Sequence, residues 1–210
     1  MRLTGARENT DNRKMKRMDS KAFFKLLSGR SRADAAAAER VAGSHLCELT
    51  VMMCDASGFS RRLHEYGVLP FFTAMARCHE RILPMIARSG GDCIAHDADN
   101  ILAVFPDCRD AVRAAASIQR WLRSRNARLP DPERFHLCIG IHRGEVVRLK
   151  DRILGPAVNI AAKLGEDLAG KDEVLLTRQT LERLPPGVRT AYLRSTEIGG
   201  KTFELHTLAF

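Results

Sequence analysis

Apolar stretches of strand length alternate with apolar positions at helical spacing along most of this chain, and their order leaves few folds open. Residues 46–54 predict a strand buried on both faces, and 68–87 predict a helix that is kinked, or begins a new turn, at Pro84. Short strands are predicted at 93–96 and 100–105, facing each other across the turn 97–99. The later predicted elements are a helix over 109–125, a strand within 135–147, a helix over 155–168, a strand over 173–177 and closing strands over 189–198 and 202–208. This order is typical of a ferredoxin-like, split βαβ sheet of the α+β class, with helices packed over one face.

The chain divides into two parts by composition. Its 210 residues suit one ordinary domain, which we place at residues 46–210. Residues 1–45 form a basic N-terminal tail with short helices, the first capped by Asp19 or Ser20, and residues 1–18 show no periodicity.

The net charge of +9 lies mostly in this tail. Residues 1–45 hold eleven Lys or Arg and five Asp or Glu, a net of +6, which leaves +3 for the other 165 residues. Because no aromatic residues interleave these charges, we interpret the tail as a solvated leader and expect no nucleic-acid partner. DNA binding through the tail is kept as an alternative.

Membrane and secreted classes find no support in the sequence. No apolar run approaches the ~20 residues of a membrane span, and the N-terminus has no signal-peptide pattern. The six cysteines include no CxxC pair, which is typical of a reducing compartment. We therefore expect a cytoplasmic protein.

Two acidic residues stand where predicted strands end. Asp55 follows the first strand, and Asp99 lies in the turn that the fold brings to a neighbouring strand. A carboxylate pair at adjacent strand ends is typical of a divalent-metal site that handles nucleoside triphosphates, although each residue alone is typical of a turn or helix cap. The backbone amides of Ser57, Gly58 and Phe59 offer an anion-binding nest beside the pair.

Four motifs in order and spacing resemble the class III nucleotidyl cyclases, the adenylate and guanylate cyclase catalytic domain, over about residues 46–210. They are Asp55-Ala56-Ser57-Gly58-Phe59-Ser60; Gly90-Gly91 followed by Asp99 to Ala103-Val104-Phe105; Gly140-Ile141-His142-Arg143-Gly144; and Gly155-Pro156-Ala157-Val158-Asn159-Ile160-Ala161-Ala162-Lys163-Leu164. The resemblance implies a class III cyclase homology domain that converts a nucleoside triphosphate into a 3′,5′-cyclic nucleotide and pyrophosphate.

The resemblance also implies roles for single residues. Asp55 and Asp99, with the Ala56 carbonyl, would hold two Mg²⁺ or Mn²⁺ ions. Asn159 would orient the ribose, and Lys163 takes the place of an arginine that steadies charge on the α-phosphate. Lys201 is similar to the family's triphosphate-binding lysine, and Arg148 or Lys150 could serve the same anion, although the favoured interpretation of Lys201 is an exposed lysine without a role.

The base pocket departs from the family. Ala95 stands where purine cyclases have a lysine, and Arg152 stands where they have an acidic residue. A guanidinium donates and never accepts, so Arg152 would favour a carbonyl-bearing base edge, which ranks UTP slightly above GTP and ATP. A short leader without a sensor is similar to the pyrimidine cyclases of bacterial antiphage signalling, which make cyclic UMP or cyclic CMP.

The family builds each site from two subunits, so the resemblance implies a head-to-tail homodimer with two equivalent sites. The sequence also bears on other interpretations besides the choice of base. A catalytically degenerate cyclase-fold protein that binds nucleotide or regulates a partner is favoured by Ala95, Ala98, Arg152 and Lys163. A diguanylate cyclase is disfavoured because Cys93 and Ile94 fill the last two places of its motif. A zinc site at Cys78 and His79 is disfavoured by its spacing.

Overall fold

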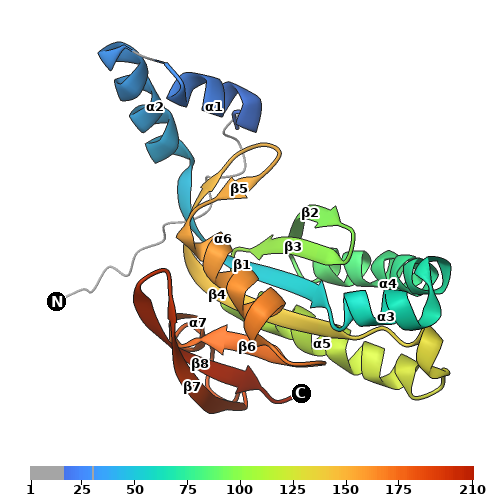
Figure 1. The fold of residues 1–210 in the computed structure, drawn as a ribbon. Coiled ribbons are helices and arrows are strands. Elements are labelled where there is room, and N and C mark those ends of the chain that lie inside the picture. Colours follow the sequence, from blue (N-terminus) through green and yellow to red (C-terminus); the bar gives the residue numbers. More distant parts are fainter. Residues whose placement is uncertain (1–16, 30) are drawn as a thin grey trace.

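A computed structural model describes residues 17–29 and 31–210, and the tail residues 1–16 lie outside this part. In the described residues one eight-stranded sheet runs in the order β2-β3-β1-β4-β6-β8-β7, with β5 paired to β4 (Figure 1). The strands are β1 (Leu46–Ala56), β2 (Asp92–Asp97), β3 (Asn100–Phe105), β4 (Leu137–Arg148), β5 (Ile153–Leu154), β6 (Val174–Thr177), β7 (Thr190–Ile198) and β8 (Lys201–Leu208). The α+β fold class is as predicted.

Helices connect these strands. They are α1 (Ser20–Leu27), α2 (Arg32–His45), α3 (Phe59–Tyr66), α4 (Val68–Arg88), α5 (Cys108–Asn126), the 3₁₀ helix η1 (Asp131–Glu133), α6 (Pro156–Ala162), the π-helix η2 (Lys163–Leu168) and α7 (Arg178–Leu181). None of the helices in the described part has the length and apolar character needed to cross a bilayer.

The helices cover both faces of the sheet, so the prediction of one covered face is wrong. Met52 and Cys54 of β1 pack with α4 and α5, whereas Val51 and Met53 pack with Ala157 of α6. Because successive side chains of a strand point to opposite faces, α6 lies across the sheet from α4 and α5. Figure 1 shows α6 in front of the sheet and α5 behind it.

Two glycines let η2 touch the backbone of the sheet. A Cβ added at Gly140 of β4 would lie 2.4 Å from the carbonyl oxygen of Ala161 and 2.4 Å from the amide nitrogen of Gly165. A Cβ added at Gly165 would lie 2.8 Å from the carbonyl oxygen of Met53. Because a β-carbon does not fit at such distances, this close approach requires glycine at both position 140 and position 165.

Helix α4 runs through Pro84 without ending, so no separate helix begins there. Pro84 is exposed, so the carbonyl that loses its helical donor faces water. The flanking Ile82 and Ile86 are fully buried and hold both halves of the helix against the sheet.

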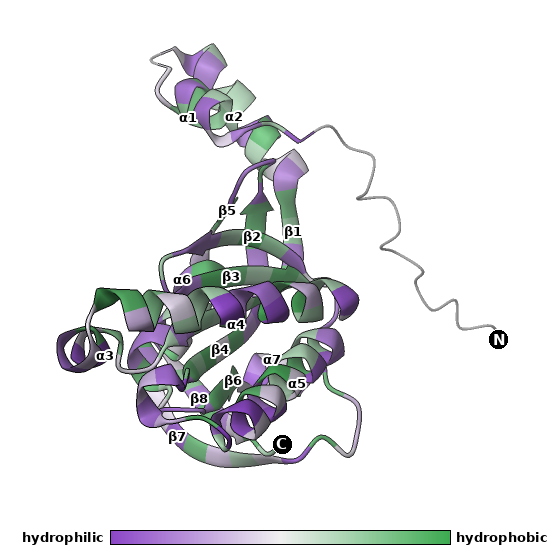
Figure 2. Cartoon of the chain, turned by 90° about the vertical axis from the view of Figure 1, so that its right-hand side faces the viewer, coloured by the Kyte–Doolittle hydropathy of each residue, from purple (hydrophilic) through white to green (hydrophobic). Residues whose placement is uncertain are grey.

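The pair α1–α2 extends away from the sheet at the β5 end (Figures 1 and 2). Asp19 caps α1 as predicted, since its side chain accepts a hydrogen bond from the Ala22 amide. Ser20 donates from both its amide and its hydroxyl to Asp151, at 2.7 and 2.5 Å, in the turn between β4 and β5. The N-terminal helices are therefore tied to the turn that carries Arg152.

Candidate functional site

The structure brings Asp55 and Asp99 into contact. Asp55 lies near the end of β1 on the face covered by α6, as Met53 does, and Asp99 lies in the turn between β2 and β3. Burial, the charges of Asp99 and Glu166 and a hydrogen bond with Asp99 raise the pKa of Asp55 to about 7. Two carboxyl groups from distant stretches of sequence thus share one small region, as predicted.

The backbone of this turn is strained at Ala98, which has a φ of 46°. Only glycine adopts such left-handed backbone without cost, and the cyclase pattern has glycine at this position. The departure from the family therefore affects the conformation that presents Asp99.

A third acidic residue, Glu166, faces this pair and was not singled out from the sequence. Burial and the charges of Asp167 and Asp99 raise the pKa of Glu166. Glu166 follows Gly165, whose contact with Met53 brings the π-helix close to the end of β1. The missed signal was the glycine at 165, which permits this approach.

The donor set of this region suits a divalent cation. Hard cations such as Mg²⁺ and Mn²⁺ prefer carboxylate and carbonyl oxygens, and a cation relieves the repulsion that raises the pKa of Asp55. No group of three or more His, Cys, Asp or Glu side chains in the described residues is arranged to hold a metal. Ligands beyond the two aspartates must therefore come from backbone carbonyls, water or phosphate oxygens.

The predicted anion nest keeps two of its three amides. The Ser57 amide donates to the His136 carbonyl oxygen at 2.9 Å, so it does not face a ligand, and its predicted role is corrected. Gly58 adopts left-handed backbone, with a φ of 75°, and Phe59 opens α3. Amides of a first helical turn have no helical acceptor, so those of Gly58 and Phe59 stay in the proposed nest.

Asn159 and Lys201 lie in a second region, a cavity of about 810 Å³ between α6 and the β7–β8 hairpin. Gly144, His142 and Phe203 also line this cavity. Lys163 follows α6 and is exposed, with its ammonium 2.7 Å from the Asp167 carboxylate. Asn159 and Lys201 therefore share a cavity that the aspartate pair does not line, whereas Lys163 begins η2, the element that approaches the end of β1.

The predicted base residues lie elsewhere again. Ala95 is exposed on β2 and pairs in register with Leu102, which packs on the α6 face. His96 stacks on His79 of α4, with ring centroids 5.9 Å apart, so it points to the opposite face from Ala95. Arg152 is exposed in the turn between β4 and β5. Neither Ala95 nor Arg152 lines the cavity that holds Asn159.

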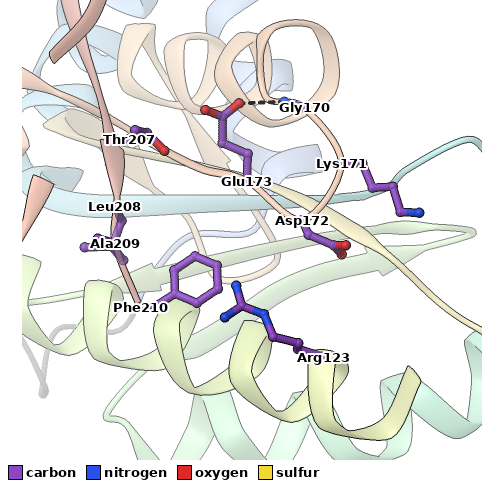
Figure 3. Close-up of a pocket in the computed structure, with 9 residues that line it drawn as sticks. All are labelled: Arg123, Gly170, Lys171, Asp172, Glu173, Thr207, Leu208, Ala209 and Phe210. Atoms are coloured by element: carbon purple, nitrogen blue, oxygen red, sulfur yellow. Dashed lines mark hydrogen bonds between the residues drawn. The ribbon is translucent and has the colours of Figure 1, made fainter. Parts of the chain in front are cut away.

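A separate cavity of about 470 Å³ lies beside the last strand (Figure 3). The guanidinium of Arg123 lies over the Phe210 ring at 5.0 Å, and the Glu173 carboxylate accepts from the Gly170 amide at 2.8 Å. None of the predicted site residues lines this cavity, so it has no part in the predicted chemistry.

Solved structures of nucleotide cyclases share this architecture. An adenylate/guanylate cyclase/hydrolase from Silicibacter pomeroyi is 23% identical, with a TM-score of 0.67, over 78% of this chain and 96% of that chain. The adenylyl cyclase CyaB from P. aeruginosa is 16% identical, with a TM-score of 0.69, over 79% and 95%. This is the class III adenylate/guanylate cyclase fold. The predicted cyclase fold is thereby confirmed.

Sequence comparison agrees with the cyclase fold over part of the chain. A Rhizobium meliloti protein named "Putative adenylate cyclase 3" is 26% identical over 114 residues, which are 54% of this chain and 19% of that protein. The Myxococcus xanthus serine/threonine-protein kinase pkn2 is 28% identical over 134 residues, 61% of this chain and 15% of that protein. The matched part thus spans less than a fifth of either curated relative. No protein-family model matches the chain.

Proposed function

We propose that the protein is a nucleotidyl cyclase, which converts a nucleoside triphosphate into a 3′,5′-cyclic nucleotide and pyrophosphate. The observation that carries this proposal is the contact between Asp55 and Asp99 on the α6 face of a cyclase fold. The polar members of the motif that follows, Asn159 and Lys163, lie on the helix over that same face.

Asp55 and Asp99, with the Ala56 carbonyl, would hold two Mg²⁺ or Mn²⁺ ions, which supply a lowered pKa at the 3′-hydroxyl and charge compensation on the phosphates. The 3′-hydroxyl gives its proton to water as its oxygen attacks the α-phosphorus, the bond from that phosphorus to the oxygen of the β-phosphate breaks, and pyrophosphate leaves with the electron pair. The amides of Gly58 and Phe59 donate to phosphate oxygens.

The other predicted residues orient the reacting groups. Asn159 binds the ribose and holds the 3′-oxygen in line with the α-phosphorus. Lys163 places its charge beside the α-phosphate, in exchange for its present partner Asp167. Lys201 shares a cavity with Asn159 and binds the triphosphate from the β7–β8 hairpin.

Asn159 and the aspartates lie at different positions along the sheet of one chain. Asp55 pairs with Cys138 of β4, whereas Gly144, which lines the cavity of Asn159, pairs with Leu49. Ala157 lies beside Gly144 and Ala161 beside Gly140, so Asn159 lies about four strand residues from Cys138, roughly 13 Å along the strand. We therefore propose a head-to-tail, two-fold homodimer in which each site takes its aspartates from one subunit and Asn159 from the other.

The base preference rests on Arg152 and Ala95. Arg152 is exposed, and it can only donate hydrogen bonds, so a carbonyl-bearing edge such as uracil O4 or guanine O6 suits it. Ala95 leaves room where purine cyclases carry a lysine. We propose UTP as the favoured substrate and cyclic UMP as the product, with a role in antiphage signalling.

A catalytically degenerate protein of the same fold is the second candidate function. The strained Ala98, the exposed Arg152 and the lysine at 163 are the observations that favour it. Such a protein would bind nucleotide without releasing pyrophosphate.

Incubation of the purified protein with each of the four nucleoside triphosphates and Mn²⁺, followed by mass spectrometry, separates the two functions. A cyclic nucleotide of one base and equimolar pyrophosphate are expected. Asp55→Asn and Asp99→Asn should abolish the product, while Asp110→Asn in α5, on the opposite face of the sheet, serves as the control. If the protein binds nucleotide but forms no product from any triphosphate, the cyclase proposal is wrong and the degenerate function is supported.

A further inference from the structure

The outer surface of α4 and α5 is strongly basic. The two helices carry eight arginines and two acidic residues, Glu80 and Asp110, and no lysine. They pack side by side on the face of the sheet opposite α6 (Figure 2). This charge lies in the folded domain, not in the tail.

A cavity of about 480 Å³ lies where α4 meets the C-terminal end of α5. Arg77 comes from α4, and Trp121, Arg125 and Arg128 come from α5 and the residues after it, with Glu133 at the rim. Arg125 is held in place, because its guanidinium donates to the Glu133 carbonyl oxygen at 3.0 Å. Among the described residues, the side chains of Arg77 and Arg128 have no hydrogen-bond or ion-pair partner.

The composition of this cavity points to one class of ligand. Unpaired guanidiniums bind phosphate oxygens in a forked geometry, and an indole offers a face on which a base stacks. The Glu133 carboxylate, which forms no ion pair in the described structure, can accept from an amino group or a ribose hydroxyl. A volume of about 480 Å³ accommodates one nucleotide.

We propose that this cavity is a binding site for a free mononucleotide, with the phosphate on Arg77 and Arg128 and the base on Trp121. The site lies across the sheet from the Asp55–Asp99 pair, so it is separate from the proposed catalytic site and does not depend on catalysis. A nucleotide bound here would bridge α4 to the end of α5.

Trp121 is the only tryptophan of the chain, so its fluorescence reports on this cavity directly. We would titrate the protein separately with the four nucleoside 5′-monophosphates, inorganic phosphate and a single-stranded oligonucleotide. At least one monophosphate should quench the fluorescence saturably, and Arg77→Ala combined with Arg128→Ala should weaken its binding by about tenfold or more. Arg81→Ala, an exposed arginine one turn along α4 outside the cavity, should change it less than about twofold.

Three results would overturn the proposal. They are a fluorescence that no monophosphate changes, binding of inorganic phosphate as tight as that of the nucleotide, and binding of the oligonucleotide alone. Circular dichroism of the double variant shows that it is folded, and equilibrium dialysis of the same variants measures binding without the fluorescent reporter.

Discussion

At the residue scale, burial sets the ionisation of the polar side chains near α6. The Asp55 carboxyl is partly buried beside two other acids, and its pKa rises to about 7. His142 is buried on β4, its Nδ1 lies 2.8 Å from the Thr177 hydroxyl, and burial lowers its pKa to about 4. Asp55 has this raised pKa at the proposed cation site, whereas His142 is held neutral as part of the core.

His142 predicts an acid limit to stability. In the unfolded chain its pKa is near 6.5, so between pH 6.5 and about 4 the unfolded state binds a proton that the folded state does not. The free energy of unfolding should be unaffected by this group above pH 6.5 and fall by about 3 kcal/mol as the pH drops through that interval. Urea denaturation of His142→Gln, compared with the exposed control His64→Gln, should show a weaker pH dependence only in the former. If the wild-type protein, His142→Gln and His64→Gln show parallel dependences of unfolding free energy on pH, the lowered pKa of His142 is contradicted.

Lys163 predicts the outcome of a charge-conserving substitution. An arginine at this position keeps the charge and adds a fork, so Lys163→Arg should preserve or raise kcat. Lys163→Ala should lower kcat by about a hundredfold or more, since it removes charge from the transition state. The control is Lys171→Ala, which lies at the separate cavity of Figure 3. Complete loss of activity in Lys163→Arg would mean that this residue does not face the α-phosphate.

At the element scale, the contact of η2 with β4 decides where the acidic groups meet. Gly140 and Gly165 allow the backbones to touch, and this contact carries Glu166 to the end of β1. The π-helical turn over Lys163–Leu168 lies at the same place. Irregular helical turns of this kind are frequent at functional sites, where they adjust side-chain direction without ending the helix.

Gly140→Ala tests this contact. The added carbon would lie 2.4 Å from the Ala161 carbonyl oxygen, so the helix must move outward, and we expect a loss of about 1–3 kcal/mol in the free energy of unfolding. Gly43→Ala in α2 meets nothing within 4 Å and should be neutral or slightly stabilising. Urea denaturation of both variants measures the difference. Equal stability of the two variants would contradict the close packing.

The α+β class and the convergence of Asp55 with Asp99 could be predicted from the sequence, because apolar runs and a tight hairpin fix which strand ends are neighbours. The side of the sheet that α6 covers could not, since its small residues Ala157 and Ala161 are compatible with either face. Glu166 was missed because its position depends on a backbone contact between two glycines far apart in sequence.

At the scale of the whole molecule, the functional groups divide between two places that one subunit keeps apart. The aspartates lie at the end of β1, and Asn159 lines the cavity beside the β7–β8 hairpin. We propose that one nucleotide meets both at a boundary between two copies of the chain. The central claim is therefore that catalysis belongs to the dimer, and that each subunit supplies a different half of every site.

The cyclase activity of a mixture of two inactive variants tests this claim most directly. Asp99→Asn removes a proposed metal ligand, and Asn159→Ala removes the ribose contact, so each protein alone should form no cyclic nucleotide. In a one-to-one mixture half of the dimers are mixed, and each of these has one intact site, so about a quarter of the wild-type activity should return. An inactive mixture, although mass spectrometry shows that mixed dimers have formed, would contradict the account.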